Sequence, residues 1–462
     1  MNPLDADGSG NDAAVGRDAK NTDANRAGDE RYFSRIRRRD FLGAAAAALA
    51  LGATHLGARR RRDPPNVLFI LTDQFRGDAL GAAGNLPVHT PNLDRLARQG
   101  VRFSHAYCAQ ALCTPARATL LTGMYPHKHG LMGNVYNVPT VIGDPRYRLS
   151  ENFPVLLKRA GYVTGYVGKW HLGEENPGFF DYWKGFNSLL QPWLGERQKS
   201  PYRSDVETDD GLRFLEQNRG RRFLLYQSYY PPHTPYTAPE KFYRYYEGKS
   251  LQPMEYYAAI SAVDWNVGRL LDGLERLGLT DNTLVVFTSD HGETFGRRAF
   301  SKHKGVCYEE SAHIPLLMRH STLLPHGKVW NAGVSSVDLM PTILSATGLP
   351  VPPGVQGQNL LDVVRRGRDR WEHPVFLQNI GEGQAVIERA VRTGRWKLIL
   401  RGLQAEPQWR MDDLYDLTRD PGETTNRFAE SPATVTDLSR SLVNWGRQYD
   451  DEVAIRFASR YA

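Results

Sequence analysis

Short apolar runs that each end in a polar or ionisable residue constrain the fold of this 462-residue chain most strongly. The clearest is NVLFILTD at 66–73, a continuous apolar segment typical of a strand buried on both faces of a parallel sheet. Further strands are predicted at 101–107, 162–168, 222–228 and 283–289. Helices are predicted at 90–100, 153–160, 209–218 and 255–277. This alternation predicts an α/β fold with a large, mainly parallel sheet sandwiched by helices.

The C-terminal part of the chain has a different pattern. After a predicted helix at 337–347, a Pro/Gly-rich stretch at 350–357 marks a linker. The elements predicted beyond it are strands at 390–400 and 411–417 and a final helix at 434–449. We therefore expect a smaller α+β subdomain at 370–462, after a catalytic domain at 64–365.

The N-terminal region is expected to be a signal rather than part of the fold. Residues 1–30 are rich in Asp, Asn, Gly and Ala, which predicts disorder. The sequence RRDFL at 38–42 and the Ala/Leu/Gly run after it resemble a twin-arginine export signal. That run of about 16 residues is shorter than the ~20 residues of a membrane span, although a signal anchor is an alternative. We expect residues 1–58 to direct export by the twin-arginine machinery to the periplasm or the cell exterior.

Net charge and cysteine content exclude some classes of protein. The net charge is +7, and because residues 1–58 contain eight basic and eight acidic residues, the excess belongs to the rest of the chain. A moderately basic body attracts anionic substrates, and no basic helix or aromatic-basic motif indicates nucleic-acid binding. Three cysteines exclude a disulfide-stapled scaffold. Cys108 and Cys307 could pair or remain buried thiols.

The remaining cysteine, Cys113, lies in the segment LCTPARATLLTG at 112–123. Pro115 suits the first turn of a helix and Gly123 suits its end, which places Cys113 at a helix N-terminus. Arg117 lies one turn later on the same face, where the helix dipole also favours anions. A buried structural cysteine on an ordinary helix is the alternative for such a segment taken alone.

Polar residues that follow four of the predicted strands should gather in one cleft. Ligands of open α/β sheets bind outside the carboxyl ends of the strands. The residues at these ends are Asp73, Gln74, Lys169, His171, His233, Asp290 and His291. The oxygen donors Asp73, Gln74 and Asp290 suit a hard cation, although one strand-end aspartate alone is more often a turn-former or a helix cap.

Several motifs together resemble one enzyme family. The segment at 112–123 resembles the sulfatase signature C-x-P-x-R followed by Leu-Thr-Gly, and GKWHLG at 168–173 resembles the second signature of that family. PHTPY at 232–236, KGVCYEE at 304–310 and LYDL at 414–417 resemble later segments of the same family. The chain is thus identified as a member of the type I, arylsulfatase-like sulfatases of the alkaline-phosphatase superfamily.

The resemblance implies the cofactors of a sulfatase. Cys113 would be oxidised to formylglycine by a formylglycine-generating enzyme. The family's single divalent cation, usually Ca²⁺, would be bound by Asp73, Gln74, Asp290, His291 and the formylglycine. His291 would bring a nitrogen donor to an ion that prefers oxygen ligands. The ligand set alone does not separate Ca²⁺ from Mg²⁺ or Mn²⁺.

The resemblance also implies the catalytic roles. Lys169 and Lys304 would contact the sulfate oxygens, and Arg117 would orient the hydrated formylglycine. His233 would protonate the leaving group, and His171 would deprotonate the remaining hydroxyl. The expected reaction is hydrolysis of a sulfate ester, of a sulfated glycan or an aryl sulfate.

Three alternatives share parts of this pattern. A formylglycine-dependent phosphodiester or phosphonate monoester hydrolase would use nearly the same residues. A two-zinc phosphatase with a Ser or Thr nucleophile is disfavoured, because Cys113 occupies the nucleophile position. A non-catalytic glycan-binding protein would keep Cys113 unmodified. Loops at 132–150, 174–204 and 229–250 are expected to line the cleft, but the sequence does not identify the substrate, exo or endo action, or the oligomeric state.

Overall fold

The computed structural model describes residues 63–462 except 85–86, 189–190, 368, 381–385 and 404–408. The predicted disordered region and export signal at 1–58 lie outside the described residues. Among the residues that are described, no helix combines the length and the apolar character needed to span a lipid bilayer.

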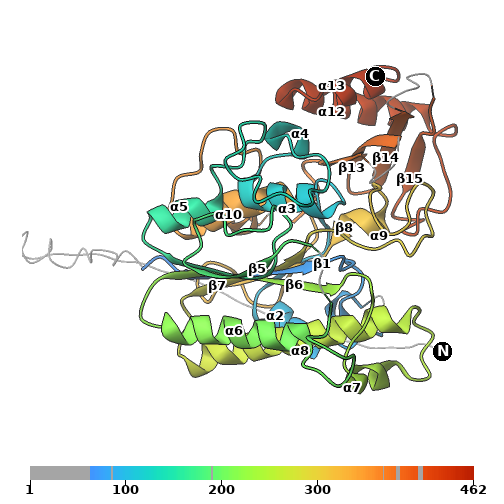
Figure 1. Ribbon diagram of the computed structural model, residues 1–462. Helices are drawn as coiled ribbons and strands as arrows, with labels where there is room; N and C mark the ends of the chain where they lie inside the picture. The colour runs from blue at the N-terminus through green and yellow to red at the C-terminus, as the bar shows by residue number, and fades with distance from the viewer. Residues whose placement is uncertain (1–62, 85–86, 189–190, 368, 381–385, 404–408) are drawn as a thin grey trace, which may run out of the picture. The chain divides into compact units, whose positions relative to one another are not determined.

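An eight-stranded sheet forms the centre of the molecule (Figure 1). Its strands in spatial order are β10 (Lys328–Trp330), β2 (Val101–Phe103), β9 (Leu316–Arg319), β7 (Thr283–Ser289), β1 (Asn66–Asp73), β6 (Phe223–Pro232), β4 (Val163–Lys169) and β5 (Tyr182–Phe186). Only β9 runs antiparallel to its neighbours. The predicted fold, a mainly parallel sheet, is confirmed.

Helices cover both faces of this sheet (Figure 1). On one face lie α3 (Cys113–Thr122), α5 (Phe153–Arg159) and α10 (Leu339–Ala346), and on the other lie α2 (Pro91–Gln99), α6 (Arg203–Gln217) and α8 (Met254–Arg276). Successive residues of β1 accordingly enter two separate cores: Phe69 and Leu71 pack in one, Leu68 and Ile70 in the other. This two-sided burial explains why the β1 sequence is continuously apolar.

A smaller C-terminal subdomain, at the upper right of Figure 1, contains an antiparallel sheet and two helices. The strands are β12 (Val375–Ile380), β13 (Val386–Arg392), β14 (Trp396–Leu403) and β15 (Asp413–Asp416), and the helices are α12 (Pro432–Tyr449) and α13 (Glu452–Ala458). A three-stranded sheet of β11 (Val334–Ser335), β3 (Ala106–Tyr107) and β8 (His313–Ile314) completes the strands. Shorter helices are η1 (Gly81–Ala83), α4 (Pro126–His129), α7 (Glu240–Tyr243), η2 (Arg244–Tyr246), α9 (Glu309–Ala312), η3 (Ser336–Asp338) and α11 (Leu360–Arg366).

Three sequence-based boundaries were wrong. The strand predicted at 101–107 is divided into β2 and β3, which belong to different sheets because the backbone at Ser104 turns to bond Trp330. The strand predicted at 390–400 spans parts of β13 and β14, which are joined by a turn closed by the Thr393 N–H to Trp396 bond. Helix α6 starts at Arg203, earlier than predicted, while β12 and α13 were not predicted at all.

Candidate active site

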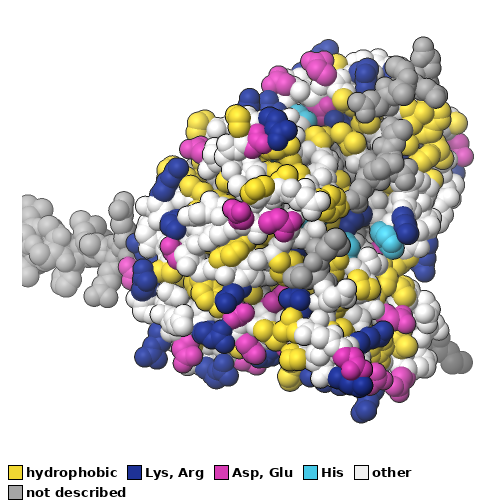
Figure 2. Space-filling model, in the orientation of Figure 1, with side chains coloured by type: hydrophobic (Ala, Val, Ile, Leu, Met, Phe, Trp, Pro, Cys, Tyr) yellow, Lys and Arg dark blue, Asp and Glu magenta, His cyan; other side chains and the backbone are white. Residues whose placement is uncertain are grey.

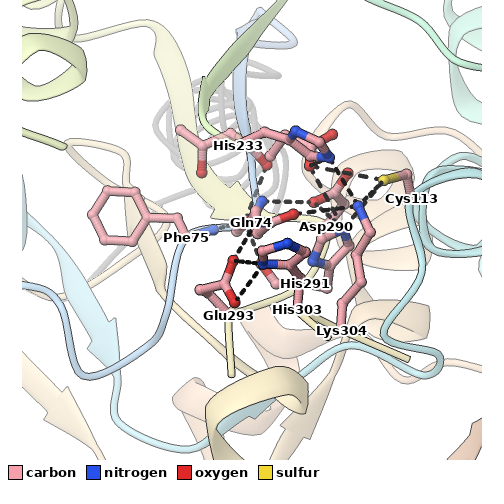
Figure 3. A network of polar contacts seen from close by, with 12 residues as sticks. Gln74, Phe75, Cys113, His233, Asp290, His291, Glu293, His303 and Lys304 are labelled. Atoms are coloured by element: carbon pink, nitrogen blue, oxygen red, sulfur yellow. Dashed lines mark hydrogen bonds and ion pairs between the residues drawn. The ribbon is translucent and has the colours of Figure 1, made fainter. Parts of the chain in front are cut away.

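The carboxyl ends of the parallel strands bring the predicted polar residues together (Figure 3). Asp73 ends β1, Lys169 ends β4, and His233 and Asp290 directly follow β6 and β7. Since these strands are neighbours and parallel, their ends meet at one edge of the sheet. Cys113, at the start of α3, faces the same place.

Helix α3 has the capping that its sequence predicts. Leu112 precedes it in an extended conformation, and Gly123 ends it with a φ of 64° while donating its N–H to Thr119. A left-handed φ favours glycine at this position. All ten residues of the helix are buried, so Cys113 is fixed at the helix N-terminus.

Arg117 holds the two strand-end carboxylates in place. Its Nη2 lies 3.0 Å from Oδ2 of Asp73, and its Nε lies 3.0 Å from Oδ2 of Asp290. Its Nη1 donates to the Lys169 carbonyl and to Ser228, and the Lys169 ammonium lies 2.6 Å from the same Asp73 oxygen. Both Oδ2 atoms are therefore engaged by cations, which leaves the two Oδ1 atoms facing the opposite side.

The residues on that side fit a divalent cation. Asp73, Cys113, Asp290 and His291 are buried, and one potential ligand atom from each lies within 4.8 Å of the others. The His291 Nε2 lies 3.5 Å from Oδ1 of Asp73 and 3.6 Å from Oδ1 of Asp290. Two carboxylate oxygens and the amide oxygen of Gln74 supply the oxygen donors that hard cations prefer, with His291 as an additional nitrogen donor.

Cys113 differs from the other two cysteines in its electrostatic surroundings. All three are buried free thiols, so the alternative of a Cys108–Cys307 disulfide is wrong. Burial raises the pKa of Cys108 and of Cys307. Burial alone would raise the pKa of Cys113 too, but the nearby Lys169, Lys304 and His291 bring the pKa of this thiol well below its usual value. The Lys304 Nζ lies only 3.0 Å from the Cys113 sulfur, so this position stabilises negative charge.

Two histidines with lowered pKa values lie beside Cys113. Burial and the nearby Lys304 lower the pKa of His233, whose Nε2 lies 2.9 Å from the Lys304 Nζ and whose Nδ1 bonds the Thr234 carbonyl. Burial and Lys169 lower the pKa of His171 to about 4. Neither ring nitrogen of His171 has a hydrogen-bond partner of normal geometry among the described residues, so both are available to a reacting group.

Two candidate site residues have strained backbones. Gln74 has a φ of 71° and His171 a φ of 56°, values that are uncommon for residues other than glycine. Such strain persists where the surrounding structure fixes a functional side chain. Each residue follows the end of a strand, and the turn directs its side chain toward Cys113.

The open space beside Cys113 is a cavity of about 190 Å³. Each loop predicted to line the cleft contributes to its wall. The lining residues that the sequence did not single out are Asn134, Tyr136, Ser188, Tyr230, Thr234 and His303. A larger cavity of about 580 Å³ does not include Cys113, and the charged Arg76 and Asp78 in its wall pair with each other. We therefore assign the substrate to the smaller cavity.

Lys304 reaches the site, whereas Lys302, two residues earlier, is exposed to solvent. His303, which lies between these two lysines in the sequence, lines the cavity and lies 3.3 Å from the buried carboxylate of Glu293. Both residues were missed by sequence reasoning, although Glu293 follows His291 by only two positions. Proximity to a recognised motif residue was the one signal that could have identified them.

Solved structures with the same architecture define the class of protein. A protein in complex with its substrate D-glucosamine-2-N,6-O-disulfate is 25% identical, with a TM-score of 0.69 over 84% of this chain and 99% of that one. A phosphonate monoester hydrolase of Agrobacterium radiobacter, 24% identical, has a TM-score of 0.68 over 83% and 96% of the two chains and supports the fold alone. Fold and site together define an alkaline-phosphatase-like hydrolase of ester anions.

Sequence comparison identifies the family within that class. The model of the sulfatase family matches residues 65–349, and a model of the C-terminal region of N-sulphoglucosamine sulphohydrolase matches residues 298–445. An ulvan-active sulfatase of Formosa agariphila is 32% identical over 379 residues, covering 72% of each chain. The chain belongs to the sulfatase family and is a sulfuric ester hydrolase.

Proposed function

We propose that this protein hydrolyses a sulfate ester of a sulfated glycan, using a formylglycine made from Cys113 and one divalent cation. The observation that carries the proposal is the placement of Cys113 among Lys169, Lys304 and a buried set of carboxylates and imidazole. The ion that we favour is Ca²⁺, since most donors are oxygens. One relative is named for its activity on ulvan, and a structural neighbour was solved with a disulfated glucosamine as its substrate, which supports a glycan substrate.

The charges inside the cavity match a sulfate ester. On the face shown in Figure 2, Lys and Arg side chains are interspersed with Asp and Glu, so basic residues form no single broad patch there. The concentrated positive charge instead comes from Lys169 and Lys304 on either side of Cys113. We propose that these two ammonium groups bind the non-bridging and bridging oxygens of the sulfate.

The side chains that move protons follow from the same geometry. The formylglycine would supply a hydroxyl nucleophile for sulfur, and the cation would supply neutralisation of the sulfate charge. His233 neighbours Lys304, so we propose that it protonates the leaving oxygen once the bound sulfate anion has raised its proton affinity. His171, whose buried ring nitrogens have no hydrogen bond of normal geometry to the described residues, would accept the proton of the remaining hydroxyl. Arg117 holds Asp73 and Asp290 fixed throughout.

The test of this proposal combines one mass measurement with one set of rates. Protein co-expressed with a formylglycine-generating enzyme should yield a peptide with Cys113 converted from thiol to aldehyde. The converted protein should hydrolyse 4-nitrophenyl sulfate and sulfated glucosamine, and Cys113→Ala should lose this turnover. A higher kcat/KM for phosphonate or phosphate esters would instead support the phosphonate hydrolase alternative. An unmodified Cys113 in a folded protein that binds sulfated sugars without turnover would support the binding-protein alternative.

We also propose that the protein is exported through the twin-arginine signal within residues 1–58. The cysteine would then be modified in the cytoplasm, before the folded protein is exported. Replacing both Arg38 and Arg39 by lysine should leave the protein in the cytoplasm, as cell fractionation would detect. Export of this variant at the normal level would contradict the proposal.

A further inference from the structure

Glu293 is a buried carboxylate in the loop after β7, and neither the catalytic roles nor the ion-binding roles proposed above include it. Three side chains from distant parts of the chain and one nearby backbone N–H converge on it, and Figure 3 shows Gln74 and His303 among them. Its oxygens accept hydrogen bonds from the Gln74 amide, the Tyr236 hydroxyl and the Phe295 N–H, and the His303 Nδ1 lies 3.3 Å away. The Tyr236 and Phe295 bonds measure 2.5 and 2.6 Å.

The Glu293 oxygens accept from Tyr236 and Phe295 as well as from Gln74, so this carboxylate determines which end of the Gln74 amide faces it. The NH₂ group of Gln74 must point toward Glu293. The amide oxygen then points the other way, toward the cavity, where it lies 3.3 Å from the Lys304 Nζ. The Gln74 backbone is fixed as well, since its N–H donates to Asp290 and its carbonyl accepts from Tyr256. The side chain therefore has one orientation that satisfies both of its ends.

We propose that Glu293 is a positioning residue that makes Gln74 present its oxygen, rather than its NH₂ group, to the divalent cation. A cation gains from an amide oxygen and is repelled by an amide NH₂, so the orientation decides whether Gln74 is a ligand. The same carboxylate holds His303 at the rim of the cavity. This inference rests on the proposed cation site and assigns one further residue to it.

The variant Glu293→Gln tests the orientation of the Gln74 amide, because the Gln and Glu side chains have almost the same shape. The new amide has one acceptor oxygen where Glu293 had two. If its NH₂ group faced the Phe295 N–H, two donors would meet and the backbone could not turn away. The NH₂ group should therefore face Gln74, which would rotate its own amide to accept and would then present NH₂ to the cation.

The measurement is calorimetric titration of the formylglycine-containing protein with Ca²⁺. We expect Glu293→Gln to raise the dissociation constant on the order of 10- to 100-fold, the range found for residues that orient metal ligands. The double variant Gln74→Glu with Glu293→Gln exchanges donor and acceptor and keeps the net charge. In it, the amide at 293 donates to the carboxylate at 74, whose second oxygen faces the cation, so most of the lost affinity should return.

A matched control is Glu310→Gln, which makes the same chemical change in a glutamate whose backbone carbonyl accepts the Glu293 N–H but whose carboxylate pairs with Arg298. Its Ca²⁺ affinity should equal that of the unmodified sequence. The proposal is overturned if Glu293→Gln binds Ca²⁺ normally, or if the double variant binds no better than the single one, which would indicate a merely structural role. Failure of the proposed function is distinguishable, because the unaltered protein would then neither bind Ca²⁺ nor hydrolyse sulfate esters.

Discussion

At the scale of single residues, two of the histidines in the site have different surroundings. His233 shares a hydrogen bond with Lys304, whereas the ring nitrogens of His171 have no hydrogen bond of normal geometry to the described residues. Burial and the Lys304 ammonium lower the pKa of His233, so the acid role that we propose requires a bound sulfate anion to raise it again. The ring nitrogens of His171 can accept a proton from a newly formed group. These surroundings support the acid and base roles that we propose.

The role of His233 predicts a dependence on the leaving group. In His233→Ala, hydrolysis of an alkyl or sugar sulfate should fall on the order of 10²- to 10⁴-fold, because the poor leaving group needs a proton. Hydrolysis of 4-nitrophenyl sulfate should fall much less, because its leaving group departs as a stable anion. Steady-state kinetics on both substrates checks this expectation, with the exposed His326→Ala as control. An equal loss on both substrates would contradict an acid role.

Sequence reasoning identified the site residues that end strands or belong to contiguous motifs. Asp73, Asp290 and Cys113 are examples, since each is marked by the run of residues next to it. Glu293 was missed because its importance arises from contacts with residues 74, 236 and 303, which are distant in sequence. The sequence signal for Glu293 is only its proximity to His291, and it does not reveal the contacts with residues 74, 236 and 303.

At the scale of elements, α6 contains a buried acid that is paired with no base. The carboxylate oxygens of Glu207 have no hydrogen-bond partner among the described residues. Burial is the main cause that raises the pKa of Glu207 from 4.5 to about 8. In the unfolded chain the group ionises near 4.5, so between these two pH values the folded state binds more protons. Stability should therefore fall as pH rises through this interval.

The fall in stability with rising pH predicts how the variant Glu207→Gln behaves. The variant should unfold at a higher temperature than the unaltered protein at pH 8, with a gain of up to a few kcal/mol, and the gain should nearly vanish at pH 5. Calorimetric melting at both pH values provides the measurement. The exposed Glu196→Gln, whose carboxylate pairs with Lys199, is the control and should show no such pH dependence. An identical gain at both pH values would show that Glu207 is not protonated in the folded state.

The helices and strands that were predicted correctly are those with the clearest local sequence patterns. Strands β1 and β7, buried on both faces, were found because their apolar runs are continuous. The division of 390–400 into β13 and β14 was missed because only the short Thr393 turn separates the two strands. The start of α6 was placed too late because its first residues include polar ones whose burial depends on neighbouring loops.

At the scale of the whole molecule, the C-terminal subdomain supports the segment that contains Lys304. The Cys307 N–H donates to Glu388 of β13 over 2.7 Å. Lys397 of β14 is completely buried and lies 2.9 Å from Glu309 and 2.7 Å from Glu423. The second sheet thereby fixes the backbone on the C-terminal side of Lys304.

Removal of this buried cation should destabilise the whole protein. Lys397→Met leaves the Glu309 and Glu423 carboxylates without their shared partner, which should cost about 3–5 kcal/mol. The midpoint of urea unfolding measures this loss. Arg395→Met, which removes a half-exposed ion pair with Asp416 in the same subdomain, should have little effect. Equal effects of the two variants would show that burial does not strengthen the Lys397 contacts.

The burial of Cys113 has a consequence for the order of events during synthesis. Cys113 is only 1% exposed, and Lys304, which lies against it, depends on Glu388, Lys397 and Glu423 for its position. These supporting residues are synthesised after Cys113. In the maturation that we propose, a modifying enzyme would have access to the thiol while the second half of the chain is still being made, and completion of the C-terminal sheet would end that interval. Slower translation beyond residue 304 would lengthen the interval and increase the converted fraction.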